Sequence, residues 1–491
     1  MAVAFFLACF LWFGGDGLRT DFTHDDLMNG WRGWFRSWKD HLLDIVLFWR
    51  PVPGYRPLGN ILYKVFFSLS GLNLFWMRVF LTGLLLAGTF LAYSLARRLA
   101  GSREAAALTA LLLVHHSGFS HFYYNTGTCY DILSYFFYLA SLLLYVRIRQ
   151  AGRFPRVHEI GAIGGLLILA LDSKEMAVTL PLAIGFYEIL YHRPARIASR
   201  ELGHWLACAA IVPVICGVLV AAFVFGRVLS AEGLGQVSGY TMTISPAEYL
   251  KQTSNYLNDL FYSRGWFNPA KTAIFLLVLL GMALRSRRLL YGWLLFNTGI
   301  LPMAFIPPRS LTAIIIPLVG LMMYAAILLV SARDGVLAIW RFWRKPGSAP
   351  ESPPLFGLYG RKQFALFAAL ALLLWRTHAR YPITLENWRP EQTQIRGVIE
   401  QWRQLHPSLR KGGRVLIVKD PFGKFEWASI FIGRLLYNDD TLTIDRLGML
   451  KEEPDAQALR QYDQILTYEE GRLRDVLPSE LWGKSPDLPA L

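Results

Sequence analysis

Apolar segments recur along this chain from its first residue to about residue 376. We count about eleven of them by their continuous hydrophobic runs. A helix needs roughly 20 apolar residues to cross a bilayer, and most of these segments approach that length. The pattern predicts an α-helical polytopic membrane protein with about eleven transmembrane helices, at approximately 1–14, 73–95, 105–118, 131–147, 159–172, 176–191, 204–228, 269–284, 289–306, 311–331 and 363–376.

The composition supports a membrane protein and excludes several other classes. Hydrophobic residues make up 54% of the chain and charged residues only 17%, against about 25% charged residues in soluble domains. This argues against a soluble enzyme, a disordered protein and a coiled coil. The net charge of +15 is typical of cytoplasmic loops held against anionic lipid, so we expect a lipid bilayer as partner and no nucleic acid.

Arginines and lysines gather in alternate loops and predict the orientation. By the positive-inside rule these loops face the cytoplasm. The amino end is then cytoplasmic, segment 1–14 is a retained span rather than a cleaved signal peptide, and the chain after residue 377 is external. We expect a bacterial inner membrane, with the carboxyl-terminal part in the periplasm. The basic loops lie at 97–103, 147–156, 193–200, 285–288 and 333–362.

Two domains follow from this division. Residues 1–376 form a transmembrane module with a long external loop at 15–72. Residues 377–491 are predicted to form a small extracytoplasmic α/β domain, preceded by a Pro/Ser-rich cytoplasmic linker and the last span. In this domain we expect strands near 413–418 and 463–467 and helices near 391–405 and 425–436, and the linker at 345–354.

The external loop contains an aromatic helical stripe. Trp31, Trp34, Trp38 and Leu42 fall on one face if the segment is a single helix. That pattern is typical of a helix in the headgroup plane. The alternative is a surface helix packed on the spans.

Acidic residues directly after the first span are the main candidates for chemistry. Asp25 and Asp26 follow His24. One carboxylate can accept a proton from an attacking hydroxyl, and the pair can hold a divalent cation through oxygen ligands. The alternative is ordinary solvated loop charge. The same loop ends at Arg56-Pro57, where a planar guanidinium suits a phosphate.

Further unusual polar residues fall on the external side. Each has a structural alternative: histidines at a span end are commonly plain interfacial residues, a carboxylate suits a helix amino end, and adjacent opposite charges suit a surface ion pair. Their common location is what favours a site. They are His116, His121, Tyr124, Asn125, Asp131, Lys174, Glu175 and Arg309.

Together these motifs resemble the GT-C superfamily, membrane glycosyltransferases that use polyprenyl-phosphate-linked sugars. The closest pattern is that of the protein O-mannosyltransferases and their relatives with tetratricopeptide repeats, although such repeats are absent here. Residues 116–121 with Asp131 match one family motif, and 171–181 (LDSKEMAVTLP) match another. Residues 308–320 are similar to a third, and His121 stands where the family has an acid.

The resemblance implies an inverting transfer of a sugar from a polyprenyl-phosphate donor to an acceptor hydroxyl of a protein, lipid or glycan. Asp25 or Asp26 would act as base, and His121 would orient the acceptor or share the proton. Donor phosphate would be held by Arg56, Lys174 and Arg309. A divalent cation (Mg²⁺ or Mn²⁺) on Asp25 and Asp26, or catalysis without metal, both stay open. Implied substrate-binding residues are His24, His116, Tyr124, Asn125, Asp131 and Glu175.

Two other function classes are compatible with the composition. A transporter or flippase of lipid-linked saccharides should carry ionisable residues or broken helices near the middle of the bilayer. The span centres here are nearly free of charge, which counts against this alternative. A non-catalytic membrane adaptor would leave Asp25 and Asp26 without a function.

Overall fold

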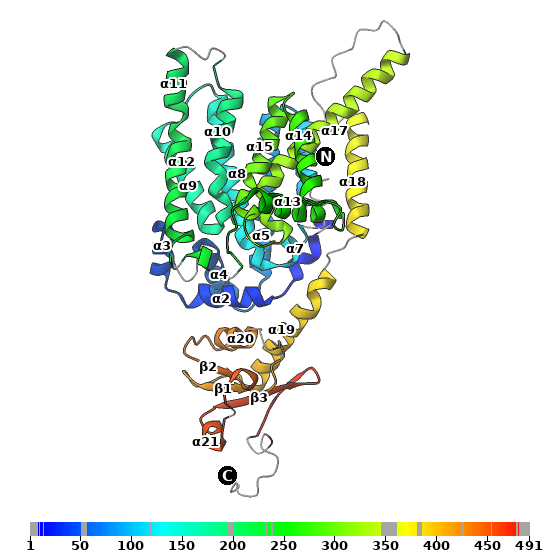
Figure 1. Ribbon diagram of the computed structural model, residues 1–491. Helices are drawn as coiled ribbons and strands as arrows, with labels where there is room; N and C mark the ends of the chain where they lie inside the picture. Colours follow the sequence, from blue (N-terminus) through cyan, green and yellow to red (C-terminus); the bar gives the residue numbers. More distant parts are fainter. Residues whose placement is uncertain are drawn as a thin grey trace.

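The structure is a computed structural model of the chain. It combines a bundle of helices with a small carboxyl-terminal domain that contains a β-sheet (Figure 1). It describes residues 8, 10–12, 14–50, 56–116, 119–194, 200–231, 233–236, 239–344, 361–380, 385–423, 427–452, 454–477 and 480.

Ten of the predicted apolar segments are helical, as expected from their composition. Segment 1–14 and the linker 345–354 fall largely outside the described residues. The bundle helices are α5 (Phe75–Ala100), α6 (Arg103–Val114), α8 (Cys129–Gln150), α9 (Val157–Ser173), α10 (Leu180–Tyr191), α11 (Arg200–Ala209), α12 (Ile211–Phe223), α14 (Pro269–Ala283), α15 (Arg287–Gly299), α17 (Ile315–Arg344) and α18 (Arg361–Arg380).

The number of membrane crossings stays a prediction. Within the described residues, four helical stretches are both long and apolar enough to cross a bilayer: Phe75–Ala100, Thr126–Gln150, Arg200–Val228 and Leu311–Ile339. Two shorter apolar helices, Pro269–Ala283 and Ala368–Thr377, accompany them. The protein is therefore an integral membrane protein with several apolar helices, as the composition predicts.

Shorter helices gather at the end of the bundle that faces the carboxyl-terminal domain (Figure 1). Several come from residues 15–72, the predicted first external loop, whose described part is mostly helical. These elements are α2 (His24–Phe35), α3 (Trp38–Val46), α4 (Pro57–Ser70), α7 (His121–Tyr124), α13 (Pro246–Phe261) and α16 (Leu301–Ala304), with single turns at Gly15–Arg19, Thr126–Thr128, Glu175–Thr179, Leu234–Gln236 and Leu311–Ile314 and a π-helical turn at Val224–Val228.

Glycines allow α2 and α4 to pack closely. A Cβ on Gly33 of α2 would lie 2.5 Å from the backbone oxygen of Asn60, and one on Gly59 of α4 would lie 2.0 Å from the ring of Tyr130. Both distances are too short for a real Cβ, so α2, α4 and the start of α8 approach as they do only because these residues are glycines.

The carboxyl-terminal domain contains a four-stranded mixed sheet with strand order β2-β1-β3-β4. The first three of these strands run parallel, and β4 is antiparallel to β3. The predicted helices and strands are present, and β2 and β4 are additional. The elements are α19 (Leu385–Leu405), β1 (Arg414–Ile417), α20 (Ala428–Leu436), β2 (Thr443–Arg446), a turn at Leu447–Met449, α21 (Ala456–Leu459), β3 (Gln464–Glu469) and β4 (Arg472–Asp475).

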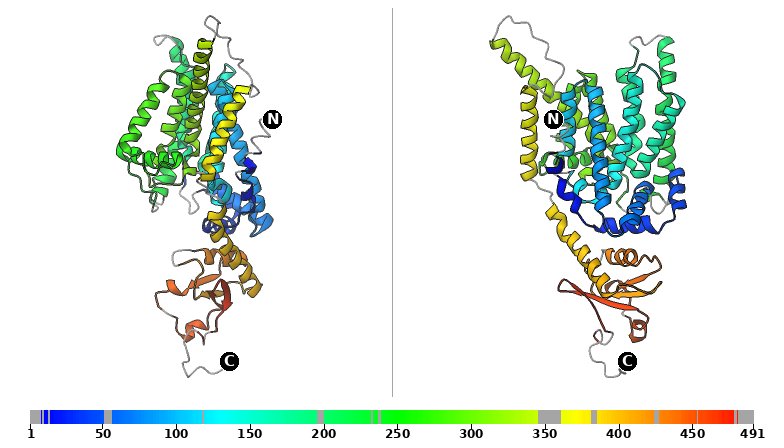
Figure 2. Two further views of the ribbon diagram at one scale, coloured as in Figure 1. Left: turned by 90° about the vertical axis from the view of Figure 1, so that its right-hand side faces the viewer. Right: turned by 180° about the vertical axis from the view of Figure 1, so that it is seen from behind.

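This domain packs against α2, and Figure 2 shows its orange helix α20 beside the blue amino-terminal helices. Trp31 Nε1 donates a hydrogen bond to Asp440 Oδ1 at 2.7 Å, and Trp34 Nε1 donates to Asn438 Oδ1 at 2.5 Å. The expected single helical stripe is thus wrong: Trp38 begins the separate helix α3. Trp31 and Trp34 are partly exposed, and the domain supplies a hydrogen-bond partner to each indole N–H. A headgroup-level position for α3 stays a prediction.

We expect Gly33→Ala to destabilise the protein, because the new methyl group would push α2 away from Asn60. Overpacking of this kind costs about 1–3 kcal/mol. The matched control is Gly30→Ala on the same helix, where the nearest atom to a Cβ is Leu435 Cδ1 at 3.7 Å. Unfolding followed by tryptophan fluorescence in detergent should show a lower midpoint for Gly33→Ala alone. Equal midpoints for the two variants would contradict the packing argument.

Candidate functional site

A polar pocket of about 240 Å³ lies at the end of the bundle that carries α2 and the beginning of α4. Its walls come from α2, from the beginnings of α4 and α8, and from the loops that contain residues 240 and 309. The lining residues are Asp25, Met28, Asn29, Arg32, Arg56, Asn60, Gly127, Tyr130, Tyr240 and Arg309.

One face of α2 forms a wall of this pocket. Asp25, Met28, Asn29 and Arg32 stand at positions i, i+3, i+4 and i+7, which share a helix face. Among the described residues, no hydrogen bond or ion pair engages the side chain of Asp25 or of Arg32. A carboxylate and a guanidinium are therefore both available to a ligand in the pocket.

Asp26 has a different environment from Asp25. It is fully buried. Its Oδ2 accepts hydrogen bonds from the Thr23 N–H and hydroxyl, each at 2.9 Å, and its Oδ1 accepts one from the Tyr63 hydroxyl at 2.6 Å. Together with Thr23 it closes a capping box at the start of α2. The expectation that the two acids converge on one cavity is thus wrong, because Asp26 caps the helix and only Asp25 lines the pocket.

This separation also bears on the candidate cation. Two carboxylates can share a divalent ion only when their oxygens converge. Both carboxylate oxygens of Asp26 accept hydrogen bonds, from Thr23 and from Tyr63. The predicted shared cation site on Asp25 and Asp26 is therefore not formed. In the described part of the chain, no group of three or more His, Cys, Asp or Glu residues is placed to hold a metal ion.

Arg56 stands at the pocket edge because Pro57 begins α4. Proline suits the first helical position and keeps the preceding residue out of the helix, and Arg56 is the N-cap of α4. Its Nη2 lies 3.0 Å from Glu175 Oε1 and donates to the Tyr240 hydroxyl at 3.2 Å. The guanidinium also lies 5.4 Å from the centre of the Tyr130 ring.

Arg309 forms the other side of the pocket. Its Nη2 donates to the Gly239 carbonyl oxygen at 2.5 Å, and its guanidinium lies 4.0 Å from the centre of the Tyr240 ring. Three guanidinium groups, those of Arg32, Arg56 and Arg309, thus surround one small volume. Their charge and planar donors suit a phosphate group.

Lys174 is placed differently from the expectation. It is not among the lining residues, because its Nζ lies 2.5 Å from Asp131 Oδ1 in the first turn of α8. Its neighbour Glu175 pairs with Arg56. Burial opposes the charge of Glu175, but Arg56 and Lys174 outweigh it and hold the pKa of this carboxyl below its ordinary value. The ion pair between Lys174 and Asp131 and the one between Glu175 and Arg56 therefore surround the pocket. Of these four residues, only Arg56 lines it.

The histidines are also outside the pocket. The His121 ring lies 5.1 Å from that of Trp388 in α19, and burial lowers the His121 pKa. The His24 ring packs 5.2 Å from Phe422. His116 Nε2 lies 2.7 Å from the carbonyl oxygen of Leu260 in α13. Their predicted contacts with substrate are not supported by the positions of these side chains.

Tyr124 and Asn125 shape the loop beside Asp25. The Tyr124 carbonyl oxygen accepts a hydrogen bond from Gln392 Nε2 at 3.0 Å. Asn125 Oδ1 accepts one from the Gly127 N–H at 2.8 Å. A Cβ on Gly127 would lie 3.5 Å from Asp25 Cβ, so this loop directly borders the acid.

Sequence reasoning missed several lining residues, of which Arg32 is the most consequential. Arg32 lies seven residues after Asp25, so the two residues share one face of the segment if it is a helix. That spacing was the available signal. Tyr240 belongs to the long segment between α12 and α13, which has no recognisable motif, and Asn60 and Tyr130 are ordinary helix residues. No local pattern marks these three.

Comparisons with known proteins agree with the predicted class. Residues 51–220 match the family described as dolichyl-phosphate-mannose-protein mannosyltransferase. This match agrees with the resemblance to the protein O-mannosyltransferases that the motifs indicated. It includes Arg56, Asp131 and Lys174 but neither Asp25 nor Arg309. No curated protein matches the sequence.

Two solved structures are also similar, at low identity. Crystal structures of ArnT from Cupriavidus metallidurans are 15% identical in the form bound to undecaprenyl phosphate and 16% identical in the apo state. Each covers 90% of this chain, and 85% and 84% of the ArnT chain respectively, with TM-scores of 0.47 and 0.45. Similarity of this extent carries no conclusion about the ligand.

We expect the buried Asp26 carboxyl to make stability depend on pH. Burial raises its pKa from 3.8 to about 6, against the opposing hydrogen bonds from Tyr63 and Thr23. The folded protein then holds a proton that the unfolded chain loses near pH 4. Stability from this group therefore falls as pH rises from about 4 to about 6, and levels off above.

Asp26→Asn should reduce the slope of the unfolding midpoint against pH, measured between pH 4.5 and 7. The control is Asp40→Asn, because a hydrogen bond from Ser37 lowers the pKa of Asp40. That carboxyl is ionised over the whole range, so the slope should persist in the control. An unchanged slope in Asp26→Asn would show that another group is responsible.

Proposed function

We propose that this protein is an inverting glycosyltransferase of the membrane. It would transfer a sugar from a polyprenyl-phosphate donor to an acceptor hydroxyl of a protein, lipid or glycan on the extracytoplasmic face. The observation that carries the proposal is the pocket itself, where the carboxylate of Asp25 stands among the guanidinium groups of Arg32, Arg56 and Arg309.

In the proposed reaction the donor phosphate occupies the arginine side of the pocket. Asp25 accepts the proton of the acceptor hydroxyl, and the acceptor oxygen forms a bond to the anomeric carbon from the face opposite the phosphate. The bond between that carbon and the phosphate oxygen breaks, and its electron pair leaves with polyprenyl phosphate. The arginines stabilise the charge that builds on this leaving group, which is the type of interaction that lowers such barriers most.

The positions of the charged loops support an extracytoplasmic site. Helices α2 and α4, which line the pocket, and the carboxyl-terminal domain lie at one end of the bundle, and the carboxyl end of α17 and the amino end of α11 lie at the other (Figure 1). The predicted basic loops adjoin those far ends. The positive-inside rule then assigns the pocket to the external side.

Buried ion pairs within the bundle are the observation that favours the alternative function, transport of a lipid-linked saccharide. Arg149 Nε lies 2.6 Å from Glu188 Oε1, and Arg227 Nη1 lies 2.7 Å from Asp172 Oδ1. Intramembrane charges can mark a transport pathway. However, these groups are paired with each other near helix ends, so they have an adequate structural reason. A transporter would move the lipid-linked saccharide without cleaving it.

We expect Asp25→Asn to reduce sugar transfer by about 10²–10⁴-fold, because the amide cannot accept the proton. The assay follows conversion of polyprenyl-phosphate mannose to polyprenyl phosphate in membranes that supply the acceptor. The control is Asp259→Asn, an exposed acid of α13 outside the pocket. Transfer at the control rate by Asp25→Asn would overturn the proposal, and transport without cleavage would favour the alternative.

Arg32→Ala and Arg309→Ala should weaken phosphate binding. A hydrogen bond to a charged group is worth about 1.5–3 kcal/mol, so the Kd for polyprenyl phosphate should rise about tenfold or more. Arg472→Ala, an exposed position on β4, is the control. Calorimetric titration with polyprenyl phosphate and with phosphate-free polyprenol separates headgroup from tail binding. An equal loss of affinity for both lipids would mean that the arginines do not bind the phosphate.

A further inference from the structure

The amino end of α2 is held by the carboxyl-terminal domain. Three residues of α19 contact the segment around Asp25. The Glu391 carboxylate accepts a hydrogen bond from the His24 N–H at 3.0 Å, Gln392 Oε1 accepts one from the Asp21 N–H at 3.3 Å, and Arg396 Nη2 lies 2.6 Å from Asp21 Oδ1.

Glu391 supplies part of the cap of α2 from 367 positions away in the chain. The first N–H groups of a helix lack partners within the helix, and a carboxylate there also meets the positive end of the helix dipole. Within α2, Thr23 and Asp26 satisfy each other's backbone N–H groups. The N–H of His24, the first helical residue, is satisfied by Glu391. Asp25 is the next residue.

Gln392 connects the two external loops that border Asp25. It is 3% exposed, and its amide accepts from the Asp21 N–H while donating to the Tyr124 carbonyl oxygen. Asp21 precedes α2, and Tyr124 precedes the Asn125–Gly127 turn against Asp25. One buried amide thus fixes the distance between the helix that carries the acid and the loop beside it.

We propose that Glu391 and Gln392 are positioning residues, through which the carboxyl-terminal domain holds Asp25 in its reactive place. The proposal rests on the function proposed above. Lys64 Nζ independently holds the other end of α2, by donating to the Trp34 and Arg36 carbonyl oxygens at 2.6 and 2.7 Å. Loss of the α19 contacts should therefore disturb Asp25, in the first turn, more than Arg32, near the end held by Lys64.

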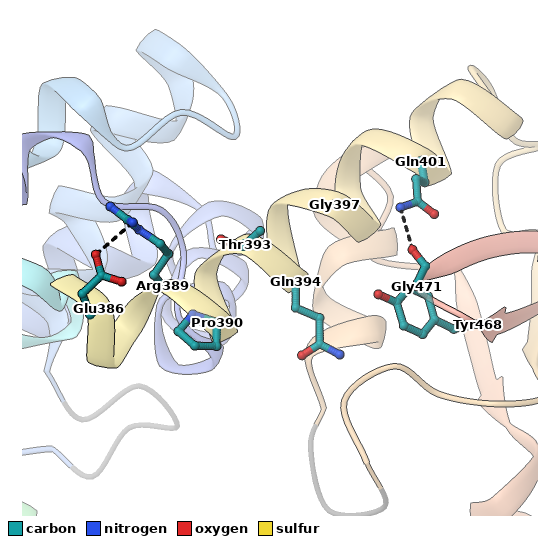
Figure 3. A pocket seen from close by; sticks show the side chains of 9 residues that line it. All are labelled: Glu386, Arg389, Pro390, Thr393, Gln394, Gly397, Gln401, Tyr468 and Gly471. Carbon is teal, nitrogen blue, oxygen red and sulfur yellow. Dashed lines mark hydrogen bonds and ion pairs between the residues drawn. The ribbon is translucent and has the colours of Figure 1, made fainter.

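The other side of α19 provides a matched control. A groove there is lined by residues that include Gln394 and Gln401 (Figure 3). The Gln394 amide donates to the Pro421 carbonyl oxygen within the domain at 2.6 Å. At about 100° per residue, Gln394 is turned away from the side that carries Gln392. Gln394→Ala therefore removes a glutamine hydrogen bond from the same helix without touching α2.

The test compares kcat and donor KM of full-length variants in the polyprenyl-phosphate mannose assay. Gln392→Ala and Glu391→Ala should lower kcat by about tenfold or more, because small misplacements of a reacting group are costly. The donor KM should stay within about twofold of wild type, because the arginines that hold the donor phosphate are unchanged. Glu391→Gln keeps an oxygen acceptor for the His24 N–H and should recover most of the rate. Gln394→Ala should resemble wild type.

Each outcome decides between the alternatives. Wild-type kcat in both alanine variants would overturn the positioning role, and so would an equal loss of rate in Gln394→Ala. A loss without recovery in Glu391→Gln would also contradict it. If Gln392→Ala fails to fold, judged by its unfolding midpoint, the Glu391 pair of variants decides. If Asp25→Asn itself remains active, the proposed function has failed, whatever the α19 variants show.

Discussion

The contact between α2 and α4 is the interaction on which the candidate site depends. Tyr63 and Lys64 are consecutive residues of α4, yet they hold opposite ends of α2: Tyr63 donates to Asp26 at the start, and Lys64 donates to carbonyl oxygens at the end. Gly33 lets the two helices approach closely enough for both contacts. Because a buried carboxylate without partners is costly, the hydrogen bonds to Asp26, together with the contacts from α19, fix where α2 begins.

A helix fixed at both ends can present two different surfaces. One face of α2 directs Asp25 and Arg32 toward the pocket, and the other directs Trp31 and Trp34 toward the carboxyl-terminal domain. The Trp31 ring also packs 5.3 Å from that of Phe431 in α20. The aromatic residues that predicted a lipid-facing helix therefore form an intramolecular interface. The same amphipathic pattern is compatible with both environments.

Much of the fold could be predicted because it depends on local patterns. Long apolar runs predicted the bundle helices, whereas α4, which begins at Pro57 within the predicted external loop, was not predicted. The strands β2 and β4 were missed because each has four residues and little hydrophobic character. For the site, the motifs identified its region, but they could not distinguish Asp25 from Asp26. That distinction depends on Tyr63, a residue 37 positions away, and on burial, which no local pattern encodes.

The turn at Lys174 and Glu175 shows how a motif can matter without lining the pocket. The two residues point their charges in different directions, Lys174 to Asp131 on α8 and Glu175 to Arg56 on α4. The ion pair with Glu175 keeps the guanidinium of Arg56 oriented and compensates part of its charge. Arg32 and Arg309 therefore contribute most of the positive electrostatic potential in the pocket. If none of the three guanidinium charges were compensated, they would repel one another in the empty pocket. The turn thus supports a preorganised pocket, whose charges need little rearrangement when an anion enters.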